Sequence, residues 1–570
     1  MNDRADFSAR TGADALLLAL KACGVDYLFA NAGTDFPPII ESFASLPADN
    51  TPAPVMVPHE TASVAMAHGY YLVTGRPQAV MVHVNVGLAN AVMGVLNAAS
   101  DNVPVLVMSG RTPLTETERP GHRSTPIHYG QEMFDQTSLV RDAVKYSYEM
   151  RYSEQAGALV ARALGLATSA PAGPVYLSLP REPLAEALPQ GAAALAPARP
   201  AATPAAPDPS AIDRLAGWLA GANRPMFICQ RGDPAGRLGP RLSDFAQRHG
   251  IGVSAAFATR NVLASDHPNF LGFLPSPELS EADLVIVLDS CTPWIPASQT
   301  PPDGARVVHI GPDPHFARMP VRGYRCDLAV QADPVLALDA LDAALADPRA
   351  GVAERNATLA GAAADRQARL TAVARAAKAT DPMGSEWLSH CLGQVMGEDG
   401  VVFSDLGALP GFLNLVGPNR FFNSPHSGGL GWAMNAALGA QLADRDRLVI
   451  AAVGDGSYMF ANPVTAHQIA EALGLPILTI VKNNAMWNAV RRSVASEYPD
   501  GAAMRSNVPP LVSLTPLPDF AAIARASRAH AETVEHGADL PAALERAIAA
   551  IRTERRQALL DVRVAVADAH

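Results

Sequence analysis

The chain has 570 residues, too many for one hydrophobic core, so the sequence predicts several domains. Apolar residues make up 49% of the chain and charged residues 17%, a composition that excludes an intrinsically disordered protein. The formal net charge of −11 excludes a broadly basic surface for nucleic acid, and the apolar runs are too short to span a membrane.

The cysteines and the N-terminus indicate the cellular compartment. The five cysteines are scattered along the chain without a CxxC pair, which favours free thiols in a reducing environment over a disulfide framework. The N-terminal stretch MNDRADFSARTGADA is polar and lacks the apolar core of a signal peptide. We therefore expect a cytoplasmic protein.

Helical and extended patterns alternate over the N-terminal third of the chain. The apolar periodicity predicts helices over 12–24, 60–75 and 88–99 and strands over 26–30, 55–58, 79–84, 103–108 and 175–179. The segment 187–208 is rich in alanine and proline, which is typical of an extended linker. Strands that alternate with helices predict a parallel sheet covered by helices on both faces.

Two further α/β patterns follow the linker. Strands are predicted over 226–230, 282–289, 305–310, 401–404, 448–453, 477–482 and 558–566, and helices over 238–249, 335–345, 432–443, 464–473 and 542–553. The expected organisation is an N-terminal domain over 1–186, a linker over 187–208, a middle domain over 209–346, a helical connector over 347–380 and a C-terminal domain over 381–570. The predicted fold class is therefore α/β, with three doubly wound parallel sheets, of which the outer two are alike.

Two segments of the C-terminal domain predict a metal site. LVIAAVGDGSYMF runs from a buried strand into a Gly-Asp-Gly turn, and IVKNNAMW follows one helix and one strand later. Adjacent parallel strands bring Asp455 and Asn484 to the same edge of the sheet, where doubly wound sheets bind ligands. Mg²⁺ prefers oxygen ligands, which the Asp455 carboxylate, the Asn484 amide and the carbonyl of Met486 supply. Either segment alone is compatible with an ordinary turn, but their joint spacing favours the metal site.

The same turn has the features of a phosphate cradle. Gly454 and Gly456 allow the backbone to approach a phosphate closely. Ser457 and the start of the following helix offer O–H and N–H donors. The segment therefore predicts that a diphosphate binds beside the metal ion.

These motifs resemble those of the thiamine-diphosphate-dependent enzyme family that includes acetolactate synthase, pyruvate decarboxylase and benzoylformate decarboxylase. GDGS followed at this distance by paired asparagines is similar to the family's diphosphate–Mg²⁺ signature. The resemblance extends over essentially the whole chain. It implies thiamine diphosphate and Mg²⁺ as cofactors, and pyrimidine-binding, middle and diphosphate-binding domains in that order.

The stretch PHETASVAMAHGYYLVTGRP resembles the family's catalytic-glutamate helix, which places that residue at Glu60. Its apolar flanks predict a partly desolvated carboxyl group that can share a proton with a ring nitrogen. The resemblance implies that this exchange generates a C2 carbanion on the cofactor, which attacks the substrate carbonyl and leads to an enamine. The alternative is a glutamate that stands at a helix N-terminus only because the helix dipole favours it.

Other stretches resemble the substrate and aminopyrimidine contacts of the family. SGGLGWAMNAALGA implies that the carbonyl of Gly428 accepts from the aminopyrimidine and that Leu430 bends the cofactor. VHVNVGLANAVMG resembles the active-site histidine stretch of benzoylformate decarboxylase, with His83 on a strand before a glycine turn, and NAGTDFPP places Thr34 in the substrate loop. His426 is a further candidate for contact with the substrate. The alternative for His83 is a buried structural role.

Two stretches bear on acetolactate synthase. Gln131 and Glu132 resemble a Gln-Glu pair of those enzymes, and a functional and a structural role are equally open for this pair. The middle-domain stretch LGFLPSPEL lacks their Met-His-Gly element. This departure disfavours FAD as an additional cofactor.

The resemblance implies a thiamine-diphosphate- and Mg²⁺-dependent enzyme that decarboxylates a 2-oxo acid, or that acts as a carboligase or lyase on an aldehyde or a 2-hydroxy ketone. Two alternatives stay open: an acetolactate synthase-like transferase with FAD in the middle domain, and a regulatory protein that binds thiamine diphosphate without catalysis. The two ends of the cofactor need separate domains, which come from different subunits in the family. We therefore expect a homodimer or homotetramer with the site at the subunit interface.

Overall fold

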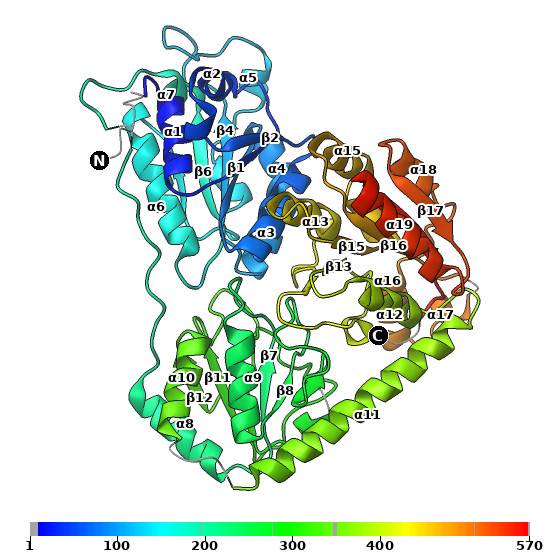
Figure 1. Cartoon of the computed structure of the whole chain (residues 1–570). Helices are drawn as coiled ribbons and strands as arrows, with labels where there is room; N and C mark the ends of the chain where they lie inside the picture. Colours follow the sequence, from blue (N-terminus) through cyan, green and yellow to red (C-terminus); the bar gives the residue numbers. More distant parts are fainter. Residues whose placement is uncertain (1–8, 194, 276, 346–349, 507, 568–570) are drawn as a thin grey trace. The chain divides into compact units, whose positions relative to one another are not determined.

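The computed structural model of the chain describes residues 9–193, 195–275, 277–345, 350–506 and 508–567 (Figure 1). Residues 1–8 of the polar N-terminal stretch, and residues 346–349 at the predicted start of the connector, lie outside the described residues. Contacts divide the chain into two compact units: residues 1–203 with 425–444, and residues 204–424 with 445–570.

The first unit contains a six-stranded sheet with the strand order β2-β1-β3-β4-β6-β5. Its strands are β1 (Tyr27–Ala30), β2 (Ala53–Met56), β3 (Gln78–Val82), β4 (Val105–Arg111), β5 (Ser147–Glu149) and β6 (Val175–Pro180). Its helices are α1 (Gly12–Ala22), α2 (Pro37–Ser45), α3 (Glu60–Thr74), α4 (Val84–Ser100), α5 (Ile127–Gly130), α6 (Ala156–Thr168) and α7 (Arg181–Ala185). Helices α1 and α6 share an apolar core with one face of the sheet, and α3 and α4 cover the opposite face (Figure 1).

Helix α3 packs very closely against α13 (Trp432–Ala443), which belongs to the same unit. A side chain on Gly69 would collide with the carbonyl of Ala436, and one on Gly439 would collide with the carbonyl of Met66. The two helices therefore meet backbone to backbone, and each glycine is needed for this approach. The contact gives α3 a rigid support.

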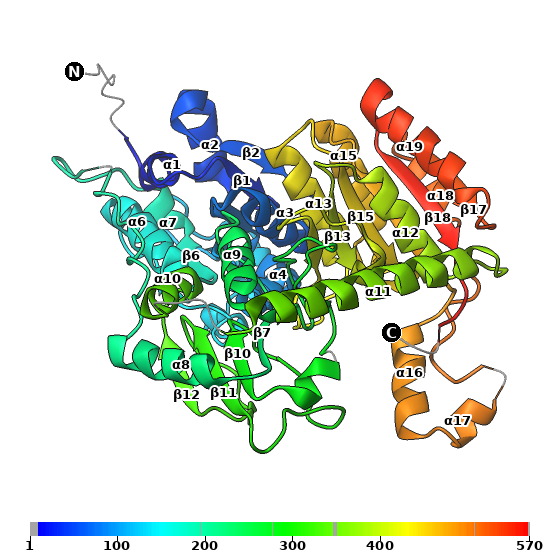
Figure 2. The ribbon, with the colours of Figure 1, turned by 60° about the horizontal axis from the view of Figure 1, so that its bottom comes forward.

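The second unit begins with a six-stranded sheet of order β12-β11-β10-β7-β8-β9. Its strands are β7 (Pro225–Cys229), β8 (Gly252–Ser254), β9 (Phe270–Gly272), β10 (Leu284–Leu288), β11 (Arg306–Gly311) and β12 (Leu328–Gln331), and its helices are α8 (Pro209–Gly221), α9 (Leu238–His249) and α10 (Pro334–Ala344). The long helix α11 (Val352–Lys378) runs from β9 and α9 to α12 (Ser385–Val395) (Figure 2). Asn261 also joins this sheet to the next one, because its Oδ1 accepts from the backbone N–H groups of Arg420 and Phe421 (both 2.8 Å).

The third sheet has the order β14-β13-β15-β16-β18-β17. Its strands are β13 (Val401–Asp405), β14 (Phe421–Asn423), β15 (Val449–Gly454), β16 (Leu478–Asn483), β17 (His530–Val534) and β18 (Ala558–Arg563). The remaining helices are α14 (Asp455–Phe460), α15 (Pro463–Leu473), α16 (Asn488–Glu497), α17 (Ala502–Arg505), α18 (Phe520–Arg525) and α19 (Leu540–Glu554). Counted from its own first strand, this sheet repeats the strand order of the first sheet, which confirms that the outer two are alike.

The three parallel sheets flanked by helices confirm the predicted fold class. One placement was wrong: His83 was expected on a strand over 79–84, but β3 ends at Val82 and His83 caps the N-terminus of α4. The short strands β5, β8, β9, β12, β14 and β17 were not predicted, because so few residues carry no periodic pattern. The five cysteines, all of which the structure describes, form no disulfide with one another. No helix within the described ranges has the length and apolar character that a membrane span requires.

Candidate active site

The loop after β1 and the residue after β3 meet where the winding of the first sheet reverses. These neighbouring strands continue into helices on opposite faces, the arrangement at which doubly wound sheets bind ligands. Asp35, in the loop after β1, and His83 form a pair there, with 2.5 Å between Asp35 Oδ1 and His83 Nδ1. The Asp35 side chain is 2% exposed and the His83 side chain 16% exposed, so the pair is largely shielded from water.

Close packing fixes the Asp35–His83 pair. A side chain on Gly33 would collide with the His83 ring, and one on Gly110 would collide with the Asp35 carboxylate. Asp35 Oδ2 also accepts a hydrogen bond from the backbone N–H of Val84 (3.2 Å). Val84 has a φ of 28°, which is strained for a β-branched residue and persists only where the surroundings require it. The strained backbone at Val84 therefore accompanies an arrangement in which both Asp35 oxygens have a partner, His83 Nδ1 and the Val84 N–H.

The second nitrogen of the His83 ring contacts Gln131. Gln131 follows α5, and its Nε2 is 3.1 Å from His83 Nε2. The Gln131 Oε1 atom is buried and receives no hydrogen bond from the part of the chain that the structure describes. Because a buried oxygen without a donor is costly, Gln131 offers an acceptor to any ligand that reaches His83.

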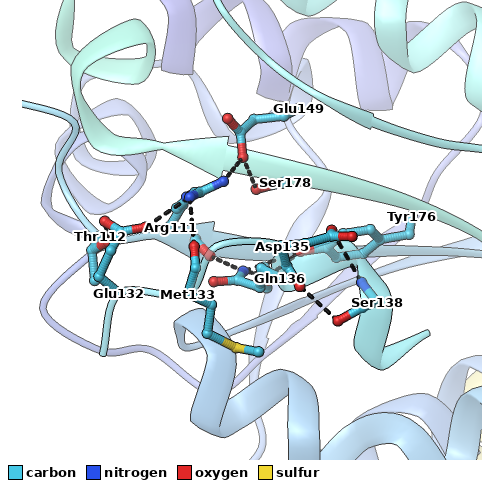
Figure 3. Close-up of polar contacts among 12 residues, drawn as sticks. Arg111, Thr112, Glu132, Met133, Asp135, Gln136, Ser138, Glu149, Tyr176 and Ser178 are labelled. Carbon is cyan, nitrogen blue, oxygen red and sulfur yellow. Dashed lines mark hydrogen bonds and ion pairs between the residues drawn. The ribbon is translucent and has the colours of Figure 1, made fainter. Parts of the chain in front are cut away.

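The next residue, Glu132, is held by two arginines and a threonine. Its Oε1 accepts from Arg111 Nη2 (2.7 Å), and its Oε2 accepts from Thr112 Oγ1 and Arg123 Nη2. Arg111, at the end of β4, also donates to Glu149 on β5 (2.5 Å) (Figure 3). Burial alone would raise the pKa of Glu132, but the Thr112 hydroxyl and the Arg111 guanidinium outweigh burial and hold this pKa below its ordinary range. Glu132 therefore ties the segment after α5 to the sheet as an anion.

Replacing Glu132 with glutamine is expected to lower the melting temperature by about 5 °C, the effect of losing roughly 2 kcal/mol of charge-assisted hydrogen bonding from a domain of this size. Because the pKa of Glu132 is lowered in the folded protein, its stabilisation is present above the unfolded-state pKa and is lost as the pH falls through the folded-state pKa. Thermal unfolding of both proteins should therefore show the full difference at neutral pH and a shrinking difference in acid.

The Glu186→Gln variant is the matched control for this experiment. Glu186 pairs with one arginine, Arg119 (2.7 Å), whose side chain is 62% exposed. An exposed pair of this kind contributes under about 1 kcal/mol, so its loss should change the melting temperature by less than about 3 °C. Equal melting temperatures of the wild type and Glu132→Gln at neutral pH would contradict the anchoring role of Glu132.

Glu60 begins α3, as the sequence predicts, and follows the edge strand β2. The residue is 7% exposed, and its Oε2 accepts from Asn90 Nδ2 on α4 (3.1 Å). Gly87 leaves room beside the other oxygen, since a β-carbon there would already lie 3.2 Å from Glu60 Oε1. A buried carboxyl group with one amide partner and space beside its second oxygen fits a ring nitrogen that exchanges a proton with it.

The segment before α13 carries the residues predicted to contact the aminopyrimidine. Asn97 on α4 binds it at three points: Gly429 N (3.2 Å), Gly429 O (2.9 Å) and Ser427 Oγ (2.6 Å). Gly428, between these contacts, has a φ of 72°, which favours glycine, and Leu430 is half-buried. The structure therefore anchors this segment to the same helix that contacts Glu60.

The other predicted substrate contacts are more exposed. Thr34 and His426 are both exposed, and the Thr34 carbonyl accepts from Arg181 Nη1 (3.1 Å). Their contact with a substrate stays a prediction. His267, in the loop before β9, contacts Ser243 Oγ (2.8 Å).

In the second unit, the predicted metal ligands meet at the carboxyl ends of β15 and β16. Asp455 Oδ2 accepts from the backbone N–H of Asn484 (3.1 Å), and its Oδ1 accepts from that of Gly456 (2.8 Å). Asn484 Oδ1 accepts from the backbone N–H of Met486 (3.2 Å), in a turn where Ala485 has a φ of 61°. The sequence prediction that Asp455, Asn484 and Met486 lie together therefore matches this geometry.

The donor set of this turn fits Mg²⁺. It offers one carboxylate, one amide oxygen and main-chain carbonyls, all of which are hard oxygen ligands. Burial raises the pKa of Asp455, because charge is disfavoured there without a counter-ion, and a bound cation would reverse this effect. Among the described residues, no group of three or more His, Cys, Asp or Glu side chains is placed to hold a metal ion.

The glycines of the turn between β15 and α14 have different surroundings. A β-carbon on Gly454 would meet nothing closer than 3.9 Å, so the backbone there is open to a phosphate. A side chain on Gly456 would collide with the ring of Trp487, so this glycine also makes room for an aromatic side chain. Ser457 is buried in the first turn of α14.

Two side-chain contacts span the crevice of the middle sheet in which a dinucleotide would bind. This sheet has the strand order of dinucleotide-binding folds, and its winding reverses between β7 and β10. Gln230 Oε1, after β7, accepts from the backbone N–H of Cys291, after β10 (3.0 Å), and Arg231 Nε lies 3.5 Å from Asp289 Oδ2. The two contacts therefore join the carboxyl ends of β7 and β10.

Comparison with known proteins covers all three sheets. Models of the thiamine pyrophosphate enzymes match residues 10–139 (N-terminal TPP binding domain), 212–341 (central domain) and 405–562 (C-terminal TPP binding domain). Benzoylformate decarboxylase of Pseudomonas aeruginosa is 28% identical over 94% of this chain and 96% of that protein. The acetolactate synthase large subunit of Parasynechococcus marenigrum is 26% identical over 90% of this chain and 82% of that protein.

A solved structure shares the whole architecture. The crystal structure of benzoylformate decarboxylase from Polynucleobacter necessarius has a TM-score of 0.77 and 22% identity, covering 98% of this chain and 99% of that one. Together with the three family models, this agreement confirms the family resemblance of the sequence motifs. The chain belongs to the thiamine-diphosphate-dependent enzyme family.

Proposed function

We propose that the protein is a thiamine-diphosphate- and Mg²⁺-dependent 2-oxo acid decarboxylase. The observation that carries the proposal is the Glu60 carboxyl group, which is buried at the start of α3 with one amide partner and room beside its second oxygen. A relative and a solved structure named benzoylformate decarboxylase support a 2-oxo acid as the substrate.

The residues of the second unit suit the diphosphate end of the cofactor. Asp455, Asn484 and the carbonyl of Met486 would bind Mg²⁺ through oxygen atoms, and the open backbone at Gly454 would accept a phosphate. When bound, thiamine diphosphate would supply the carbon nucleophile that adds to the substrate carbonyl and the electron sink for decarboxylation.

The residues of the first unit suit the pyrimidine end and the substrate. Glu60 would hold a proton and exchange it with the aminopyrimidine ring. The Gly428 carbonyl and Leu430, in the segment anchored by Asn97, would orient that ring. His83 would give a proton to the substrate or take one from it.

The direct test is the turnover of a panel of 2-oxo acids that includes benzoylformate and pyruvate. The proposal expects CO₂ release that depends on both thiamine diphosphate and Mg²⁺. A protein that binds the cofactor yet releases no CO₂ from any 2-oxo acid would instead support the regulatory alternative.

Heterodimers of Glu60→Gln and Asp455→Asn subunits are expected to show about half of the wild-type turnover, because the family's shared-site arrangement leaves one of two sites intact. If each site combines Glu60 of one subunit with Asp455 of the other, one site of the heterodimer contains both altered residues and the other site contains neither. Co-expression with two different affinity tags isolates the heterodimer for steady-state kinetics. A site built within one chain would instead leave every heterodimer inactive.

Carboligation is the second candidate function. The amide of Gln131 beside His83, and the similarity to an acetolactate synthase large subunit, favour it. Incubation with a 2-oxo acid and an aldehyde would yield a 2-hydroxy ketone if the protein is a carboligase. FAD is not part of the proposal, and the purified protein should be colourless.

A further inference from the structure

We propose that Asp35 is a positioning residue that fixes the tautomer of His83 and leaves His83 Nε2 as the atom that exchanges a proton with the substrate. Only one part of the inference rests on the proposed function, namely that His83 exchanges a proton with the substrate. The contact between Asp35 and His83 belongs to the chain itself and needs no bound cofactor.

The surroundings of Asp35 allow its carboxylate one arrangement. Its side chain is 2% exposed, its Oδ2 accepts from the Val84 N–H (3.2 Å), and its Oδ1 faces His83 Nδ1 (2.5 Å). Gly33 leaves room for the His83 ring and Gly110 leaves room for the Asp35 carboxylate, since a side chain on either glycine would collide with the group beside it. A buried carboxylate needs a donor at each oxygen, so His83 Nδ1 carries the proton that points at Oδ1.

Gln131 identifies the state of the other ring nitrogen. Its Nε2 atom, which can only donate, lies 3.1 Å from His83 Nε2, so this ring nitrogen presents its lone pair. The two contacts together assign the ring proton to Nδ1. The Gln131 Oε1 atom is buried, and none of the described residues donates a hydrogen bond to it. This oxygen can therefore accept a hydrogen bond from a ligand that reaches His83.

Other charged groups surround the pair at greater distance. Arg181 on α7 donates to the carbonyl of Thr34, next to Asp35, and Arg123, Arg181 and Glu182 act electrostatically on His128 of α5, as does Asp35 itself. Arg111 and Glu132 directly follow Gly110 and Gln131, which contact the pair. Burial, followed by the charges of Arg181 and Arg123, lowers the pKa of His128, which therefore stays neutral beside Asp35. Asp35 is thus the carboxylate in direct contact with the His83 ring.

Histidine NMR of the protein without cofactor tests the tautomer directly. In protein labelled with ¹⁵N-histidine, the His83 signals, assigned by their loss in His83→Gln, should show a protonated Nδ1 and an unprotonated Nε2. The amide of Asp35→Asn can donate to Nδ1 or accept from it, so this variant should populate both tautomers.

Kinetics of the holoenzyme give the second readout. Asp35→Asn should lower kcat by about 100-fold with KM changed less than about threefold, as for other carboxylates that orient a histidine. The pH profile of kcat should also change in Asp35→Asn, because the carboxylate contacts the ring that exchanges the proton. Asp101→Asn is the matched control: it disrupts another buried His–Asp pair (His68 Nε2 to Asp101 Oδ2, 3.2 Å) and should leave kcat and the pH profile unchanged.

A His83 ring protonated at Nε2 in the wild type, or the same tautomer and kcat in the wild type and Asp35→Asn, would overturn the inference. If Asp35→Asn does not fold, the wild-type NMR spectrum still tests the inference, because it shows which nitrogen of His83 carries the proton. Absence of any turnover that depends on thiamine diphosphate would defeat the proposed function, whereas the NMR result needs neither cofactor nor substrate and decides this inference separately.

Discussion

Glutamine at position 60 is expected to lower turnover by about 1,000-fold while cofactor binding stays near the wild-type level. Glutamine keeps the shape of Glu60, the contact with Asn90 and the fit beside Gly87, but it cannot give or take a proton. Steady-state kinetics with a 2-oxo acid measure the loss of turnover. Isothermal titration with thiamine diphosphate in the presence of Mg²⁺ measures the retained binding.

Two further variants separate proton exchange from simple loss of a buried charge. Glu60→Asp keeps an exchangeable proton on a side chain that is one methylene shorter, so its turnover should lie between those of the wild type and Glu60→Gln. Glu182→Gln removes a buried carboxylate whose hydrogen bonds are to Thr115 (N–H, 2.9 Å) rather than to a predicted site residue, and should retain most of the activity. Wild-type turnover in Glu60→Gln would contradict the role assigned to Glu60.

The meeting of Asp455 and Asn484, the proposed metal ligands, was predictable from the sequence because its geometry follows from local rules. A β-branched strand that runs directly into GDGS, and a second strand that ends in paired asparagines, place their polar residues at one sheet edge once the strands are adjacent and parallel. The structure pairs Gly454 with Lys482, which brings Asp455 and Asn484 within hydrogen-bond distance. Only neighbouring elements of the chain are needed for this prediction.

Asp35 was not predictable in the same way. In NAGTDFPP it reads as an ordinary turn residue before a helix, and its partner His83 is 48 positions away. The contact depends on the ends of β1 and β3 meeting, on Gly110 of a third strand and on the strained φ of Val84. The apolar run over 79–84 also concealed the start of α4, which is why His83 was placed on a strand.

Two asparagines of α4 carried a signal that the sequence analysis did not use. Asn90 and Asn97 are seven positions apart in an otherwise mostly apolar helix, a spacing that puts both on the same face. Asn90 binds Glu60 and Asn97 binds Gly429, so this face contacts two functional segments. The heptad spacing of the two asparagines therefore indicates the face of α4 that contacts both segments.

Asparagine at position 455 is expected to weaken Mg²⁺-dependent binding of thiamine diphosphate by about 100-fold. Asp455 is the one charged ligand in a donor set that otherwise comprises the Asn484 amide and the Met486 carbonyl, so the substitution removes the negative charge of the site. At a cofactor concentration of roughly 100 times the wild-type Kd, the wild type gains about 2.7 kcal/mol of stability and the variant only about 0.4 kcal/mol. A thermal-shift titration should therefore show a clear cofactor-dependent rise in Tm for the wild type and almost none for Asp455→Asn.

The protein without cofactor distinguishes a lost ligand from a damaged fold. Burial raises the pKa of Asp455, which means that the folded chain disfavours its charge, so an uncharged amide should leave the Tm without cofactor within about 2 °C of the wild type. Asp561→Asn is the matched control, because Asp561, on β18, is also buried with a raised pKa but accepts a hydrogen bond from Asn483 Nδ2 on β16 (2.8 Å). That control should keep the full cofactor-dependent shift, whereas an equal shift in the wild type and Asp455→Asn would show that Asp455 does not bind the metal ion.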